Sequence, residues 1–304
     1  MNEGTQAIDR VYAGLDWKLD DGILTVTIDR PECLNAIDTR TMNELTHVFA
    51  RAHRDDAVRV VIVTGRGRAF CAGGDLRPGE ATFDAVDQGR ADSAADHVET
   101  GGPLAMSVFT NHKPFIAAIN GPAVGIGLTL TLPMDLRIAV PGAKLAMSFV
   151  RRGIVPDACA TWFLPRLVGA GTALDWAVSG RTFRSEEAHR AGLVDELCPA
   201  EELLERANER AREYLAAAPV AIAATRALVW RMAGAPHPLD AYAVEAPMIF
   251  ELGARSDARE GVRAFLDKRP PRFTQRVSAD MPSNYPWWDR AEALRPEGSL
   301  PPFA

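Results

Sequence analysis

The order of apolar and polar residues predicts short strands that alternate with amphipathic helices. Residues 23–28 alternate between apolar and polar side chains, a pattern typical of a half-buried strand. From Thr41 to about residue 53 the apolar residues recur at helical spacing, and Thr41 with Glu44 has the form of a capping box. Residues 58–64 are mostly β-branched, which indicates a strand buried on both faces of a parallel sheet.

The same cycle recurs later in the chain. Residues 115–120 and 136–140 predict two further strands, with an apolar helix between them at about residues 127–134. Successive strands and helices favour an α/β core. Residues 77–102 are rich in Asp, Glu, Ala and Gly and show little periodicity, so we expect an irregular excursion or a frayed helix. Long segments of this kind often lie over active sites.

Helices replace strands after about Val194. Apolar stripes at helical spacing predict four helices, at residues 201–218, 220–232, 242–252 and 257–266. A proline-rich stretch follows, and the tail with its two adjacent tryptophans is expected to be extended. The chain therefore divides into a core at residues 1–200, a helical region at residues 201–270 and an extended tail at residues 271–304.

Composition and charge exclude several classes of function. The 304 residues are 47% hydrophobic, enough for a sizeable core, and the net charge of −6 gives no basic footprint for nucleic acid. The longest apolar stretches, residues 115–119 and 128–133, are far shorter than the ~20 residues of a membrane span. The N-terminus lacks the basic start and apolar stretch of a secretory signal. We therefore expect a cytoplasmic protein that binds neither nucleic acid nor membrane.

Cysteines and histidines predict neither disulfides nor a metal site. The four cysteines lie far apart without a CxxC pair, so reduced thiols are expected. The six histidines show no metal-ligand spacing. His112 is expected on a surface loop, and Asp135 is expected to support strand packing.

Two glycine-containing segments are the candidate chemical features. Residues 65–76 and 120–127 each follow a predicted strand, and small residues there let backbone approach a ligand closely. In the second segment the N–H groups lie at a predicted helix start, where partial positive charge collects. Taken separately, each segment is also compatible with an ordinary strand-to-helix turn. A dinucleotide fingerprint is excluded because Leu130 stands where Gly or Ala is needed, and neither a Walker loop nor a Gly-x-Ser-x-Gly elbow is present.

Four motifs, in this order and at these spacings, resemble the enoyl-CoA hydratase/isomerase (crotonase) superfamily. They are Asp29-Arg30-Pro31-Glu32-Cys33-Leu34-Asn35-Ala36, Phe70-Cys71-Ala72-Gly73-Gly74-Asp75-Leu76, Ile119-Asn120-Gly121-Pro122-Ala123-Val124-Gly125 and Phe265-Leu266-Asp267-Lys268-Arg269. The likeness covers roughly residues 15–275. It implies an α/β spiral of stacked ββα units, the ClpP/crotonase fold. It also implies a helical C-terminal region that forms homotrimers, often paired into hexamers.

The resemblance also implies how the site works. The backbone N–H groups of Gly74 and Ile126 would hold the oxygen of a thioester enolate, and donors of this kind are worth roughly 3 to 4 kcal/mol each. The side chain of Ile126 must then point away from the acyl group. No separate cofactor is implied, because coenzyme A is part of the acyl-CoA substrate. The residues expected to contact the substrate are Leu34, Ala36, Ala72, Gly73, Asp75, Leu76, Gly125, Thr129, Phe149, Trp162 and, from a neighbouring subunit, Lys268. For Lys268, a solvated helix end is the alternative.

The departures from the family pattern narrow the chemistry. Thr129 and Phe149 occupy the positions of the two hydratase glutamates, and neither can act as a carboxylate acid or base. Asp157 aligns with an aspartate that moves protons in dienoyl-CoA isomerases and is the nucleophile in 4-chlorobenzoyl-CoA dehalogenases. A structural alternative makes Asp157 the N-cap of a helix at residues 158–164. Thr129 either positions a water or bonds back to a carbonyl of its own helix.

Three functions follow from these residues. The first is an enzyme of the enoyl-CoA hydratase/isomerase type, in which Asp157 moves protons and Gly74 and Ile126 stabilise the enolate. The second is a dehalogenase or hydrolase in which Asp157 attacks an aryl-CoA or acyl-CoA. The third is a protein that binds CoA esters without catalysis. Arg151 and Arg152 either pair with Asp157 or Asp175, face CoA phosphates, or are solvated.

Overall fold

A six-stranded sheet forms the centre of the molecule. The computed structural model describes residues 12–87, 89, 92–93, 97 and 99–288. In the order β1-β2-β3-β4-β6-β9, the strands are Leu15–Asp20, Ile23–Ile28, Val60–Gly65, Phe115–Ile119, Leu136–Ala139 and Glu196–Leu197. The hairpin of β1 and β2 is antiparallel and every other pair in this sheet is parallel. All residues of β3 and β4 are buried, as expected for central parallel strands covered on both faces.

A smaller sheet of three strands accompanies the main one, and its first strand leads directly into a short helix. Its strands β5, β7 and β8 are Ala123–Val124, Lys144–Ala146 and Thr182–Arg184. A single residue, Gly125, separates β5 from helix α3 (Ile126–Thr129), and all four residues of this helix are buried. The junction between β5 and α3 is therefore held inside the molecule rather than on a surface loop.

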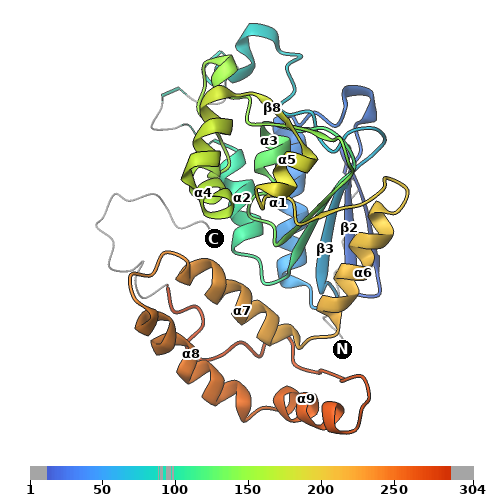
Figure 1. The fold of residues 1–304 in the computed structure, drawn as a ribbon, viewed down its shortest axis with the longest axis vertical. Coiled ribbons are helices and arrows are strands. Elements are labelled where there is room, and N and C mark those ends of the chain that lie inside the picture. The colour runs from blue at the N-terminus through green and yellow to red at the C-terminus, as the bar shows by residue number, and fades with distance from the viewer. Residues whose placement is uncertain (1–11, 88, 90–91, 94–96, 98, 289–304) are drawn as a thin grey trace.

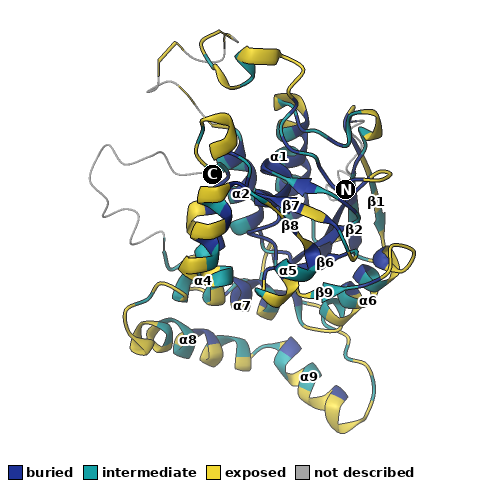
Figure 2. Cartoon of the chain, turned by 45° about the horizontal axis from the view of Figure 1, so that its top comes forward, coloured by how far each residue is buried: buried dark blue, intermediate teal, exposed yellow. Residues whose placement is uncertain are grey.

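Helices cover both faces of the main sheet (Figure 1). On one face, Leu203, Ala207 and Ala211 of α6 (Leu203–Leu215) pack against β3, β4 and β6. On the other, α1 (Thr39–Arg54) buries Leu45 and Phe49 and packs beside α2 (Gly101–Phe109). Figure 2 shows the buried residues concentrated in the sheets and the inner faces of these helices.

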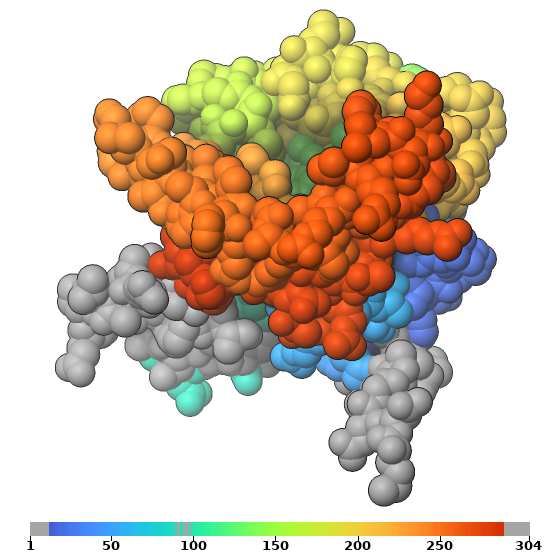
Figure 3. Space-filling view, turned by 90° about the horizontal axis from the view of Figure 1, so that it is seen from below, coloured from blue at the N-terminus to red at the C-terminus, as the bar shows by residue number. Residues whose placement is uncertain are grey.

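Three C-terminal helices extend below the core. They are α7 (Pro219–Met232), α8 (Pro238–Gly253) and α9 (Ser256–Leu266), and together they cover much of the lower face (Figures 1 and 3). Their exposed large apolar side chains are Val229, Leu239, Tyr242, Ile249, Phe250, Val262, Phe265 and Leu266. Such side chains are what an interface between subunits would cover. The trimer or hexamer expected from the sequence stays a prediction.

One buried arginine joins α7 to the core. Arg226 donates through Nε to Asp135, at 2.8 and 2.9 Å, and through its other nitrogens to the carbonyl oxygens of Phe109, Asn111 and Pro133. Asp135 also accepts from the Phe115 N–H at the start of β4. The prediction that Asp135 supports strand packing is confirmed.

Most predicted elements are present, with shifted ends. The predicted N-cap of α1 is wrong: Asp38 caps the helix by accepting from the Thr41 N–H, while Glu44 accepts from the N–H groups of Ala13 and Gly14. The apolar helix predicted at residues 127–134 is only α3 followed by turns. Strand β9 lies beyond Val194, where strands were expected to stop.

Several elements were not predicted. They include β1, α2 and α5 (Ser185–Arg190), together with the smaller sheet, while α4 (Ala160–Ser179) was anticipated only at its start, by the alternative that placed a helix at residues 158–164. Three short 3₁₀ helices, η1 (Pro31–Cys33), η2 (Gly79–Phe83) and η3 (Val150–Arg152), complete the description, and η2 lies in the predicted excursion. The extended tail is described only as far as residue 288. His112 lies in a bend between α2 and β4, as predicted, but it is half-buried and its ring centre lies 4.0 Å from that of His53, so it is not a plainly exposed residue.

Across the described residues, no single helix is long and apolar enough to cross a membrane, although the bent pair α6 and α7 passes the same test of length and composition.

Replacing Arg226 by Met should destabilise the fold by about 3 to 5 kcal/mol, because it leaves the carboxylate of Asp135 and three carbonyls without their donor. Urea unfolding followed by circular dichroism measures this. Arg212→Met, which removes an exposed ion pair on α6, is the control and should change stability by less than about 0.5 kcal/mol. Equal effects of the two changes would contradict the anchoring role.

Candidate active site

Backbone hydrogen bonds fasten the two glycine segments together. The N–H groups of Phe70 and Cys71 both donate to the carbonyl of Pro122, at 3.1 and 3.0 Å. In return, the Val124 N–H donates to the Cys71 carbonyl at 3.0 Å. The segment after β3 and the segment after β4 therefore run side by side and end next to each other.

Glycine is required where these segments touch. A Cβ atom on Gly121 would lie 2.3 Å from the carbonyl oxygen of Arg68, and one on Gly127 would lie 2.3 Å from that of Cys71. Both neighbours are backbone atoms that cannot swing aside. Only glycine permits this approach, which is the physical reason for the glycines in the motif.

Two asparagine side chains hold the first segment in shape. Asn35, fully buried, donates to the carbonyls of Arg66 and Ala69 and accepts from the Arg30 N–H. Asn120 donates to the carbonyls of Gly65 and Gly67. These bonds satisfy carbonyls that the irregular backbone would otherwise leave unpaired.

The N–H groups of Gly74 and Ile126 are the unpaired donors of the site. Within the described residues neither has an acceptor, and both residues line the same pocket of about 640 Å³. Ile126 belongs to the main core, with 3% of its surface exposed, and that its side chain points away from the acyl group stays a prediction. Two free donors on one pocket fit a carbonyl or enolate oxygen. Their role as an oxyanion hole stays a prediction.

Asp157 supplies the enclosed carboxyl of this pocket. Its Oδ1 accepts a hydrogen bond of 2.6 Å from the hydroxyl of Thr129 on α3. The N-cap of α4 is Cys159, which makes no side-chain cap, so the reading of Asp157 as a helix cap is wrong. Because the hydroxyl of Thr129 donates to Asp157, it does not bond back to a carbonyl of its own helix, and its positioning of a water stays a prediction.

Burial raises the pKa of Asp157 to about 7. The hydrogen bond from Thr129 opposes this rise, and the negative charge of Glu99 adds to it. A carboxyl with this pKa is divided between its acid and base forms near neutral pH, as a group that takes up and returns a proton should be.

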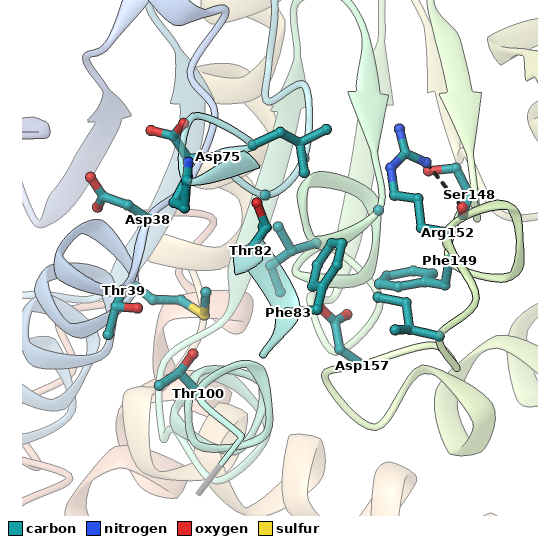
Figure 4. A pocket seen from close by; sticks show the side chains of 18 of the residues that line it. Asp38, Thr39, Asp75, Thr82, Phe83, Thr100, Ser148, Phe149, Arg152 and Asp157 are labelled. Carbon is teal, nitrogen blue, oxygen red and sulfur yellow. Dashed lines mark hydrogen bonds between the residues drawn. The ribbon is translucent and has the colours of Figure 1, made fainter. Parts of the chain in front are cut away.

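An aromatic ring closes the side of the pocket near Asp157. Phe149, 6% exposed, packs against Gly125, where an added Cβ would lie 3.7 Å from the ring. Figure 4 shows Phe149 and Phe83 toward the same end as Asp157, with Asp38 and Asp75 toward the other. The end with Asp157 therefore carries aromatic rings together with the polar side chains of Ser148 and Arg152.

The opposite end of the pocket carries a network of charges. Asp75 accepts from Arg77 and from Arg30, which also pairs with Asp38 at 3.0 Å. The Arg77 guanidinium holds the pKa of Asp75 low, at about 2. Arg30 also donates to the Ala36 carbonyl, so this network fixes the backbone on both sides of the pocket.

The structure brings together most of the residues predicted for the site. Among them the pocket is lined by Ala72, Gly73, Gly74, Asp75, Leu76, Gly125, Ile126, Phe149 and Asp157. Leu34 lies beside this group, because its carbonyl accepts from the Ala72 N–H. Trp162 instead packs against Phe109, Phe163 and Trp230, and Lys268 is an exposed residue after α9. Neither is among the described residues that line the pocket, and their substrate contacts stay predictions.

Sequence reasoning missed several residues of the pocket. Phe83, His97 and Glu99, from the predicted excursion, line it together with Asp38 and Met42 of the α1 region. The neighbouring arginines do not pair with Asp157 or Asp175: Arg151 donates to the Ser179 carbonyl, Arg152 to that of Ser148, and Asp175 pairs with Arg181. No cluster of three metal-ligating side chains occurs within the part of the chain that the structure describes.

Replacing Thr129 by Val should raise the pKa of Asp157 by about one pH unit, because it removes a hydrogen bond that favours the ionised form. Carboxyl NMR titration of Asp157 checks this. Thr131→Val is the matched control, since Thr131 is equally buried but bonds to the Leu128 carbonyl. A titration midpoint unchanged by Thr129→Val would show that this bond does not hold Asp157.

Replacing Asp157 by Asn should stabilise the fold at pH 8 and much less at pH 5. Because the folded-state pKa is raised, ionising Asp157 lowers stability as pH rises from about 4 to about 7. Thermal unfolding of both proteins at the two pH values measures the difference. A wild-type protein more stable than the variant at pH 8 would contradict the raised pKa of Asp157.

Comparison with known proteins agrees with this geometry. Residues 18–276 match the family described as enoyl-CoA hydratase/isomerase. The chain is 38% identical over 255 residues to the enoyl-CoA hydratase ACTT3 of Alternaria alternata, covering 83% of each chain. It is 34% identical over 259 residues to 1,2-epoxyphenylacetyl-CoA isomerase of Escherichia coli, covering 84% of this chain and 96% of that one.

A solved structure is also similar. The crystal structure of enoyl-CoA hydratase from Bacillus anthracis superposes with a TM-score of 0.77 at 28% identity, over 86% of this chain and 98% of that one. Fold, motifs and pocket therefore agree, and the chain belongs to the enoyl-CoA hydratase/isomerase (crotonase) superfamily of enzymes that act on CoA thioesters.

Proposed function

We propose that this protein is an acyl-CoA isomerase in which Asp157 carries a proton between two carbons of a thioester enolate. The N–H groups of Gly74 and Ile126 stabilise the enolate oxygen. The observation that supports this most is the enclosed carboxyl of Asp157, held by Thr129 in the pocket that also contains the two free N–H groups.

Isomerisation fits the side chains better than hydration does. Hydration needs one group to activate water and another to deliver a proton. At the two glutamate positions of typical hydratases, Thr129 already donates to Asp157 and Phe149 is an apolar ring. Moving a proton along one substrate requires a single base. Asp157 is suited to that task.

The steps balance without a cofactor. Ionised Asp157 takes a proton from C2 of a 3-enoyl-CoA, and the electrons of that C–H bond pass into the thioester to give a dienolate. The two N–H groups bind the new negative charge on oxygen. Asp157, now neutral, returns the proton to C4, and the double bond ends between C2 and C3. A pKa near 7 suits both halves of this cycle.

Relatives support the substrate class more than the direction of reaction. Proteins similar to this chain are named as enoyl-CoA hydratase, 1,2-epoxyphenylacetyl-CoA isomerase and carnitinyl-CoA dehydratase, and all three names denote chemistry on CoA thioesters. Coenzyme A would contact Leu34, Ala36 and residues 72–76, with Lys268 of a neighbouring copy as a further contact.

Replacing Asp157 by Asn should lower kcat for isomerisation of a 3-enoyl-CoA by about a thousandfold, since the amide cannot accept the proton. Binding of the CoA ester, measured by calorimetry, should change by less than about threefold, because shape and the Thr129 hydrogen bond are kept. Asp84→Asn, an exposed aspartate of the excursion, is the control and should retain wild-type turnover.

Three outcomes would contradict the proposal. Retained turnover in Asp157→Asn would remove this residue from the mechanism. An ester on Asp157, trapped with an aryl-CoA or acyl-CoA and found by mass spectrometry, would instead identify a nucleophile, as in a dehalogenase or hydrolase. Binding of CoA esters without turnover of any enoyl-CoA by the wild-type protein would indicate a binding protein.

A further inference from the structure

Glu99 occupies a defined position beside the catalytic carboxyl. Both of its carboxylate oxygens accept from the start of α2: Oε1 from the Gly101 N–H at 2.5 Å and Oε2 from the Gly102 N–H at 2.7 Å. These donors are among the N–H groups that a helix leaves unpaired at its first turn. The negative charge of Glu99 is therefore fixed in place although the residue is exposed.

The start of α2 also touches the turn that carries Asp157. A Cβ atom on Gly101 would lie 3.3 Å from the backbone nitrogen of Ala158, the residue after Asp157. Glu99, Thr100 and Asp157 all line the same pocket. The segment before α2 and the segment before α4 are thus in contact next to the reacting group.

We propose that Glu99 is a positioning residue for Asp157: it anchors α2 against the Asp157 turn and places a second negative charge beside the catalytic carboxyl. This inference rests on the proposed role of Asp157. A neighbouring negative charge makes a carboxyl hold its proton more tightly, which strengthens it as a base near neutral pH.

The electrostatic pattern around Asp157 supports this role. Burial is the main cause of the raised pKa of both Asp157 and the Cys159 thiol on the same turn, and the charge of Glu99 adds to the rise at each. An influence on two separate groups of one turn is expected of a charge fixed beside it.

The other groups near Asp157 do not supply this effect. Thr129 on α3 donates a hydrogen bond and lowers the pKa of Asp157. Cys71, from the first glycine segment, is neutral because burial raises its pKa to about 12. His97 and Arg152 line the pocket, and a positive charge on either would favour the ionised carboxylate. Among the described residues that line the pocket, Glu99 is an acidic neighbour whose charge raises the pKa of Asp157.

The pH dependence of kcat/KM in Glu99→Gln tests this inference. Glutamine keeps an oxygen acceptor for α2 but removes the charge. The acid limb of the profile, set by Asp157, should move about half a pH unit to lower pH, roughly a threefold fall in proton affinity. Glu99→Asp keeps the charge and should restore the wild-type limb, even if the shorter side chain weakens the start of α2.

Glu80→Gln is the matched control. Glu80 is an exposed glutamate of the same excursion and is not among the residues that line the pocket, so its removal should leave the acid limb unchanged. Thermal unfolding of all variants reports any purely structural loss.

The outcomes separate this inference from the proposed function. An acid limb in Glu99→Gln identical to that of the wild type, with Asp157→Asn inactive, would overturn the role of Glu99 alone. Equal shifts in Glu99→Gln and Glu99→Asp would also overturn it, because the effect would then arise from shape rather than charge. Retained turnover in Asp157→Asn would overturn the proposed function itself.

Discussion

The site depends on the exchange of backbone hydrogen bonds between the segments that follow β3 and β4. The Pro122 carbonyl accepts from Phe70 and Cys71, and the Cys71 carbonyl accepts from Val124. Because these bonds are made by irregular backbone, they require glycine at Gly121 and Gly127, where any side chain would collide with a carbonyl. Once the segments are joined, Gly74 and Ile126 are held on one pocket with free N–H groups. The two donors themselves are backbone groups, so the same scaffold can serve several reactions.

In the proposed mechanism the choice of reaction depends on the carboxyl of Asp157, for which the described residues show no ion pair. Asp157 receives one hydrogen bond from Thr129 and otherwise lies in a poorly solvated place, so its pKa rises to about 7. A half-buried carboxyl with a raised pKa lowers stability at neutral pH, which supports the proposed chemical role of Asp157. By contrast, Asp135 is paired with Arg226 and holds α7 to the core. Asp135, which pairs with an arginine, has a structural role. Asp157, which has only a hydroxyl group as its side-chain partner, is the residue to which we assign a chemical role.

Much of this arrangement could be predicted from the sequence, and the reasons for the misses are physical. The four motifs indicated the fold and the candidate positions Gly74 and Ile126, and a separate alignment indicated Asp157, because glycine turns and family spacing are local signals. Strand β1 was missed although Leu15, Trp17 and Leu19 alternate with polar residues. Only the start of α4 was anticipated, as a helix at residues 158–164, because Pro165 and a non-helical Gly169 interrupt its apolar pattern.

Contacts between distant residues could not be predicted in the same way. The hydrogen bond of Thr129 to Asp157 joins positions 28 residues apart and arises only when α3 and the turn before α4 pack together. Glu99 lies in a segment without periodicity, so no pattern indicated that it would approach Asp157. The N-cap of α1 is a smaller case: Asp38, three residues before Thr41, was the available signal.

The most direct test follows the proton itself. A 3-enoyl-CoA carrying deuterium at C2 is converted by the wild-type protein, and the product is examined by NMR and mass spectrometry. If one enclosed base carries the proton, deuterium should appear at C4 of a 2-enoyl-CoA. Accumulation of a 3-hydroxyacyl-CoA, with oxygen taken from water, would contradict the account.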